Sequence, residues 1–143
     1  MEIKKAAKKD LKEIASLMKK EIGKPPFNEK DSINFILKSL RFYLKNSEIY
    51  ISTENKIEGV LIFQVEQWWE GKVIIIQDLV VSYKFQKKGI GKNLMVFIEK
   101  YAKKIKAKRI YFETNKKSSA IKFYKKMGYK INKDRISMNK KMK

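Results

Sequence analysis

Six residues near the middle of the chain, Gln86 to Gly91 with the sequence QKKGIG, have the types and spacing of a turn that binds anions. The glycines at positions 89 and 91 remove the side chains that would keep a ligand away from the backbone. The helix expected to follow offers free N–H groups and the positive end of its dipole. Positive charge is added by three lysines, Lys87, Lys88 and Lys92. A phosphorylated ligand suits this turn, although glycines that serve only a positive φ angle are the plainer interpretation.

The turn joins a predicted strand to a predicted helix. The residues before it, 73–81, are rich in β-branched side chains and predict a strand. After it, apolar residues recur at helical spacing, at Ile90, Leu94, Phe97, Ile98, Tyr101 and Ile105. A strand, a glycine turn and a helix in this order would hold an anion at the start of the helix.

A second segment, residues 120–129 with the sequence AIKFYKKMGY, also combines a chemical group with a defined local structure. It predicts a short helix that carries Phe123, Tyr124 and Met127 and ends at Gly128, the usual C-terminal glycine. The phenol of Tyr124 is therefore expected at a fixed place near a helix end.

The two motifs, in this order and spacing, resemble the GCN5-related N-acetyltransferase (GNAT) family. Members carry Q/R-x-x-G-x-G/A after a central strand and Y-x-x-x-G-F/Y after the next strand. The resemblance extends from about Ile3 to Met138 and is strongest between Gln77 and Tyr129. It implies an α/β fold with a mixed, mostly antiparallel sheet of about six to seven strands, flanked by about four helices. A central parallel pair of strands would be joined by the cofactor-binding helix.

The resemblance implies acetyl-CoA as the acyl donor and a reaction without a metal. The fourth and fifth strands of the family splay apart at a bulge, and the pantetheine arm pairs with the freed backbone of the fourth strand. These positions are Leu79, Val80 and Val81, and a backbone N–H there would polarise the thioester carbonyl. The pyrophosphate would rest on the amides of Lys87, Lys88, Gly89, Ile90, Gly91 and Lys92. Tyr124 stands where the family's tyrosine protonates the leaving thiolate, and a phenol of pKa about 10 is a competent donor.

The base is less well defined, because a primary amine of pKa about 10 must lose a proton and several carboxylates are available. Glu113 resembles the glutamate that protein N-terminal acetyltransferases of this family place after the fifth strand. Asp78 and Glu66 are the alternatives. The sequence departs from the family at Lys117, where an asparagine often contacts the cofactor, and Asn115 is expected to take that role.

Composition limits the chemistry. The 143 residues predict one domain, residues 1–143, with 43% hydrophobic residues and a single core. The chain has no cysteine and no histidine, so disulfides and the usual thiolate or imidazole metal sites are excluded. No apolar run resembles a secretion signal or a membrane span, which favours a cytoplasmic protein without a membrane partner.

The net charge of +20 is concentrated in one half of the chain. Residues 1–83 hold 14 basic and 12 acidic residues, and residues 84–143 hold 21 and 3. So basic a surface would repel polyamines and favours a protein amine, an N-terminus or a lysine, as the acceptor. The alternatives are an RNA- or ribosome-binding module on the same fold and the amine of an aminoacyl-tRNA. A lysine-rich composition without binding meaning is the plainer interpretation, and the oligomeric state stays open, with a homodimer among the options.

The acceptor side of the site is expected from the helices that precede the sheet. Asp10 followed by Glu13 predicts a capping box, with a helix that ends at Gly23. A stiff connector with both prolines leads to a second helix over about residues 31–45. In the resembled family this helix pair flanks the acceptor site, so Phe27 and Tyr43 are candidates to contact substrate, with core packing as the alternative.

The strands are expected to form a meander that ends in a parallel pair. The pattern predicts strands over residues 2–6, 48–52, 57–66, 72–81 and 108–113, and a final pair over 129–131 and 135–138. The fifth strand is reached by a crossover long enough to make it parallel to the fourth. Trp68 and Trp69 would point to opposite faces, with one exposed as a wall of the acceptor site, unless both cover the end of the sheet.

Overall fold

The computed structural model describes all 143 residues and divides into two compact units, residues 1–113 and residues 114–143. Each unit is described by itself. None of the protein's helices has both the length and the hydrophobicity of a membrane-spanning segment.

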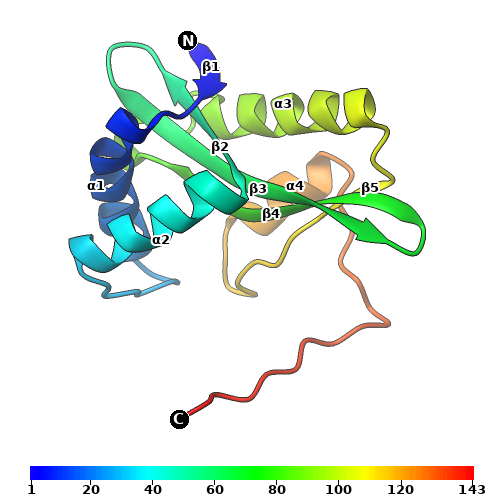
Figure 1. Ribbon diagram of the computed structural model, residues 1–143. Helices are drawn as coiled ribbons and strands as arrows, with labels where there is room; N and C mark the ends of the chain where they lie inside the picture. Colours follow the sequence, from blue (N-terminus) through cyan, green and yellow to red (C-terminus); the bar gives the residue numbers. More distant parts are fainter. The chain divides into compact units, whose positions relative to one another are not determined.

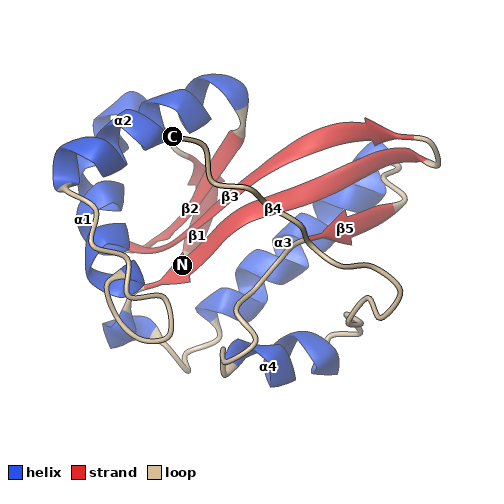
Figure 2. Ribbon diagram, turned by 90° about the horizontal axis from the view of Figure 1, so that it is seen from below, coloured by secondary structure: helices blue, strands red, loops and turns tan.

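The first unit is a five-stranded sheet with three α-helices (Figures 1 and 2). The strands run in the order β1-β2-β3-β4-β5; only β4 and β5 are parallel, and α3 connects them. The fold is thus the mixed, mostly antiparallel α/β arrangement expected, with five strands where six to seven were predicted. The elements of this unit are β1 (Glu2–Lys5), a 3-10 turn (Lys8–Asp10), α1 (Leu11–Ile22), α2 (Ile33–Asn46), β2 (Glu48–Thr53), β3 (Ile57–Trp68), β4 (Gly71–Val81), a second 3-10 turn (Tyr83–Phe85), α3 (Ile90–Ile105) and β5 (Arg109–Tyr111).

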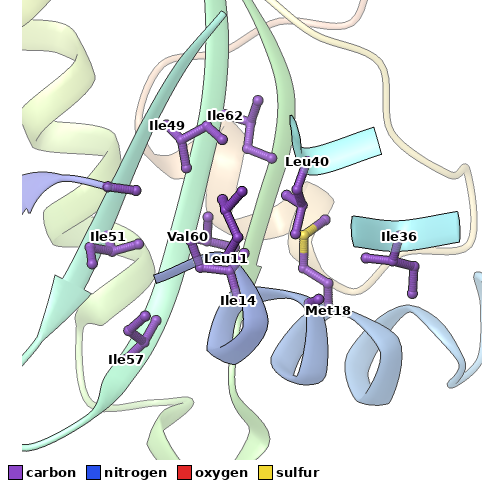
Figure 3. Close-up of a cluster of buried hydrophobic side chains, with 12 residues drawn as sticks. Leu11, Ile14, Met18, Ile36, Leu40, Ile49, Ile51, Ile57, Val60 and Ile62 are labelled. Carbon is purple, nitrogen blue, oxygen red and sulfur yellow. The ribbon is translucent and has the colours of Figure 1, made fainter. Parts of the chain in front are cut away.

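Helices α1 and α2 pack on one face of the sheet through a continuous apolar cluster (Figure 3). Ile14 of α1 and Leu40 of α2 meet Val60 and Ile62 of β3, and all four side chains are buried. Burial of large aliphatic side chains stabilises a fold by about 1.5–3 kcal/mol each relative to exposure. The β3–β4 hairpin extends well past these two helices (Figure 2).

Helix α3 packs on the opposite face through aromatic contacts. The rings of Tyr50 and Phe63 stack at 5.8 Å, and Tyr101 of α3 meets Phe63 edge-on at 5.0 Å. Near the start of α3, a Cβ atom on Gly59 would lie 3.1 Å from side-chain atoms of Ile90 and Leu94. Glycine at this position therefore allows the N-terminus of α3 to sit directly against β3.

Strand β4 contains a bulge and loses its β5 neighbour beyond it. Ile62 of β3 pairs with Asp78 and the next residue pairs with Ile76, so Gln77 is an extra residue on β4. The parallel pairing with β5 covers only residues 73–75 of β4. No strand pairs with the β5 side of β4 from the bulge to Val81, because β5 ends at Tyr111.

The second unit contains one helix, α4 (Ala120–Lys126), followed by a chain without regular structure. Gly128 has φ +98°, and the amide of Tyr129 donates to the carbonyl of Tyr124 at 3.1 Å, as in a glycine-terminated helix. The two strands predicted over residues 129–131 and 135–138 are wrong, because residues 130–143 are exposed and form no strand. Strands need a pairing partner and a buried face, and polar residues separate the few apolar ones here.

The predicted capping box of α1 is also wrong. Asp10 accepts instead from the amide of Ala7 at 2.7 Å, which closes the preceding 3-10 turn. The side chain of Glu13 extends away from α1, and its carboxylate accepts from the amide of Ile57 at 2.6 Å. A long-range contact to the start of β3 has therefore replaced a local one.

Candidate active site

The unpaired edge of β4 presents backbone groups at alternate residues. Ser82 donates its amide to Glu58 of β3 at 2.9 Å, so its backbone faces β3. Because neighbours in an antiparallel strand face alternate sides, Val80 also faces β3 whereas Leu79 and Val81 face away from it. The Val81 carbonyl confirms this, since it accepts from the Gln86 side chain at 3.0 Å.

The glycine turn follows directly and has the backbone geometry of an anion cradle. Lys87 and Gly89 both have positive φ angles, +65° and +82°. Gly89 is the N-cap residue of α3, and it has no side chain that could cover the free N–H groups of the first helical turn. Alternation of left- and right-handed residues turns successive amides toward one side, where an anion binds. A Cβ atom on Gly91 would come no closer than 3.7 Å to other protein atoms. The protein's own packing therefore does not require glycine here, and the missing side chain leaves space for a ligand.

Glu21 at the end of α1 holds the chain segment that enters this turn. Its buried carboxylate accepts from the amide of Tyr83 at 3.1 Å and lies 3.2 Å from the ammonium of Lys24. Lys24 also lies over the Tyr83 ring, 4.7 Å from its centroid. The position of the turn thus depends on a residue 62 positions earlier in the chain.

Asp78 is the carboxyl group with the most strongly changed acidity. It follows the bulge residue, and burial raises its pKa from 3.8 to about 6. A carboxyl of this pKa is about nine-tenths ionised at pH 7 and is more basic than an ordinary aspartate. Tyr43 of α2 lies close enough for Asp78 to raise the pKa of its phenol, in addition to the larger effect of burial. The two ionisable groups therefore lie near each other on the α2 side of the sheet.

The other two candidate bases have different surroundings. Glu113 lies two residues beyond the end of β5 and is exposed. Glu66 is half-buried, and its carboxylate accepts from the Gln64 amide at 2.7 Å and from the Trp68 indole at 3.1 Å. The exposed Glu113 and the hydrogen-bonded Glu66 thus differ in environment from Asp78, whose pKa burial raises to about 6.

The second unit holds Tyr124 and Asn115. Tyr124 is half-buried, and burial raises the pKa of its phenol, so this group carries its proton at neutral pH. Its ring meets Phe123 at 5.1 Å and Tyr129 at 6.2 Å. Asn115 is exposed and its side-chain oxygen accepts from the amide of Lys117 at 2.8 Å, which makes a local turn.

The two tryptophans and the connector aromatic have distinct environments. Trp68 is half-buried and packs on Tyr111 of β5 at 5.6 Å between ring centroids. Trp69 is fully exposed, and Phe27 in the connector is also exposed. The tryptophans thus differ in burial, as one of the two interpretations of the sequence predicted.

Comparison with known proteins identifies this arrangement. The family model described as Acetyltransferase (GNAT) family matches residues 10–129, which is most of the chain. The chain belongs to the GNAT acetyltransferase family. The protein is therefore of the acyl-CoA-dependent N-acetyltransferase class, and acetyl-CoA is the acyl donor of the family.

Solved structures share the fold of this GNAT protein at low sequence identity. A possible acetyltransferase from Clostridium difficile is 16% identical with a TM-score of 0.87, over 99% of this chain and 98% of the other. An aminoglycoside 6'-N-acetyltransferase from Acinetobacter haemolyticus is 16% identical with a TM-score of 0.80, over 100% of both chains. An aminoglycoside acetyltransferase from an uncultured soil metagenomic sample is 23% identical with a TM-score of 0.75, over 99% and 96%. No curated protein sequence matches the chain closely enough to count as a relative.

The geometry of this GNAT protein also shows which features the sequence had not indicated. Gln77 as the bulge residue, Glu21 as the support of the turn and the contact from Gln86 to Val81 were all missed. Gln86 had a signal, since it is the first residue of the glycine motif. The structure contains no group of three or more His, Cys, Asp or Glu residues that could hold a metal ion.

Proposed function

We propose that this GNAT protein transfers the acetyl group of acetyl-CoA to a primary amine of a protein, either an N-terminus or a lysine side chain. The observation that carries the proposal is the unpaired edge of β4, which leads directly into the glycine turn. An extended ligand with a phosphorylated end requires these two features in this order: backbone groups to pair with and a cradle for the anion.

Backbone groups of two of the three predicted residues on β4 are available to hold acetyl-CoA. Leu79 and Val81 face the open edge, whereas Val80 already faces β3. We assign the pantetheine contacts to Leu79 and Val81 and the carbonyl-polarising N–H to Leu79. The amides of residues 87–92 receive the pyrophosphate, with the ammonium groups of Lys87, Lys88 and Lys92 around it.

Acid and base are assigned to groups whose pKa values suit the two proton transfers. Acetyl-CoA supplies an activated thioester carbonyl. Asp78 takes the proton of the incoming amine, directly or through water, because burial raises its pKa to about 6. Tyr124 donates a proton to the departing sulfur, because its half-buried phenol is protonated at neutral pH. Glu113 is less suited, since it is exposed, and Asn115 is left with a supporting role beside the cofactor.

We further propose that both units form one GNAT domain, residues 1–143, because the family match crosses the boundary between residues 113 and 114. A protein acceptor is preferred because the net charge of +20 slows the approach of small free polycations, an effect on association rate that is separate from the contacts made within the site. Two of the structures that share this fold are named as aminoglycoside acetyltransferases, which agrees with an amine acceptor in general and not with a protein acceptor in particular.

The test begins with donor binding. Acetyl-CoA should raise the thermal unfolding midpoint with increasing concentration, because a ligand that binds only the folded state stabilises it. CoA release is then measured with short peptides that carry one free amine. Tyr124→Phe should lower kcat by about a hundredfold or more without loss of the acetyl-CoA shift, since it removes only the acidic proton. No midpoint shift with millimolar acetyl-CoA would refute the proposal.

A further inference from the structure

Glu66 and Asp78 lie on the same face of the sheet. Asp78 pairs directly with Ile62 of β3, so the two side chains share a face. Ile62 belongs to the apolar cluster under α1 and α2, and Glu66 lies four residues further along the same strand. Side chains alternate along a strand, so Glu66 points to this face as well. The expected acceptor side therefore carries two carboxyl groups.

The Glu66 carboxylate is fixed in position but is not neutralised. The Gln64 amide and the Trp68 indole each donate to one of its oxygens. A carboxylate has about four acceptor positions, so about two remain free for a ligand. The chain has 35 basic residues, yet its ion pairs use Glu21, Glu48, Glu54 and Glu70 and not Glu66. A carboxylate whose hydrogen-bond donors are neutral keeps its negative charge and can bind an external cation.

Aromatic rings stand beside this carboxylate. Trp68 comes two residues after Glu66, and its ring lies 5.6 Å from that of Tyr111, at an interplanar angle of 59°. Tyr111 is level with Ile75 in the parallel pair, on the same face as Glu66 and Asp78. Aromatic faces attract ammonium and guanidinium groups, Trp most strongly. Carboxylate and aromatic pair together have the chemistry of a site for an alkylammonium or guanidinium group.

The distance between the two carboxyl positions sets the spacing between the two groups that a ligand would place there. Four residues along β3 separate Ile62, the partner of Asp78, from Glu66, which corresponds to about 13 Å along a strand. An extended peptide covers that distance in about four residues. We propose that Glu66, Trp68 and Tyr111 bind a lysine or arginine of the acceptor peptide, about four residues from the amine that is acetylated at Asp78. This proposal rests on the proposed function and adds the side-chain preference of its acceptor.

The high net charge of the protein does not oppose this preference. The excess is in residues 84–143, whereas residues 1–83, which hold both carboxyl groups, have 14 basic and 12 acidic residues. Exposed charges further apart than about 8–10 Å are largely screened at physiological ionic strength. Contacts made within the site therefore dominate over the average field.

The experiment compares two peptides that differ in one side chain. Both have a free N-terminal amine; one has lysine and the other norleucine at the fifth position, and further peptides move the lysine to positions three to seven. The parent should prefer the lysine peptide by about tenfold in kcat/KM for acetylation of the N-terminal amine, the effect of one partly desolvated cation contact. Glu66→Gln, which removes the charge and keeps the size of the side chain and one of its two accepting oxygens, should reduce this preference to near one. Glu54→Gln, an exposed glutamate of the β2–β3 turn, is the matched control and should keep the preference.

Calorimetry with the same peptides gives a readout that does not require catalysis. Tighter binding of the lysine peptide to the parent but not to Glu66→Gln supports the inference even if no acetyl group is transferred. The absence of acetyl transfer would then refute only the proposed function. Equal kcat/KM for both peptides in the parent, or an unchanged preference in Glu66→Gln, overturns the inference while leaving acetyl transfer intact. Thermal midpoints within a few degrees of the parent establish that the variants are folded.

Discussion

Replacement of Asp78 by asparagine should stabilise the protein at high pH and inactivate it. The variant keeps the size of the side chain and removes the charge that burial disfavours. In the parent, burial raises the pKa of Asp78 from 3.8 to about 6, so the folded state binds this proton more tightly than the unfolded state. The stabilisation from the bound proton is complete below pH 4 and is lost as the pH rises through 6.

The magnitude follows from the pKa difference. A rise of about two units corresponds to about 3 kcal/mol of folding free energy, fully lost by about pH 8. Asparagine never ionises, so the advantage of Asp78→Asn over the parent should grow from near zero at pH 4 to about 3 kcal/mol at pH 8. In a domain of this size the corresponding change in midpoint is about 10 °C.

Urea unfolding of both proteins at one-unit steps between pH 4 and pH 8 measures this difference directly. Asp134→Asn is the control, because it removes an exposed carboxylate and leaves the buried one in place. A difference between Asp78→Asn and the parent that does not change with pH would refute the argument, since it would mean that the buried carboxylate is compensated. Activity adds a second criterion: the variant should lose acetyl transfer at every pH while still showing the acetyl-CoA shift.

Further predictions concern the glycine turn and the support of α1. Gly91→Ala should fold with at least the stability of the parent, because its Cβ atom meets only ordinary contacts, yet should weaken the acetyl-CoA midpoint shift. Gly89→Ala should cost about 1–2 kcal/mol in urea unfolding, because alanine is strained at φ +82°; equal stability of the two variants would contradict this account. Glu13→Ala should cost about 1–2 kcal/mol, because the amide of Ile57 loses its acceptor, and exposed Lys12→Ala on the same helix should change stability by less than about 0.5 kcal/mol.

The order of elements and the donor turn could be predicted from the sequence because their signals are local. Hydrophobic spacing placed α3 at residues 90–105, and glycine chemistry placed the turn before it. The length of the connection between β4 and β5 was enough to make them parallel. Each of these inferences depends on residues that are neighbours in the chain.

Features that depend on distant residues were predicted poorly. Glu13 fits a capping box locally but finds a better partner in Ile57, 44 positions away. The pattern of residues 129–138 is compatible with strands, but a strand exists only where another strand pairs with it. The raised pKa of Asp78 follows from burial, which is not visible in the residue types, and the bulge at Gln77 beside it was not visible either.

We expect the bridge made by Glu21 to couple the binding of the two substrates. Its carboxylate joins the last turn of α1, which leads into the connector on the acceptor side, to the amide of Tyr83 at the entrance of the donor turn. Ordering either end through a bound ligand therefore lowers the entropy lost when the other end is ordered. Such synergy is reciprocal by thermodynamic necessity: the factor by which acetyl-CoA tightens acceptor binding must equal the factor by which acceptor tightens acetyl-CoA binding. We therefore expect each substrate to bind more tightly in the presence of the other.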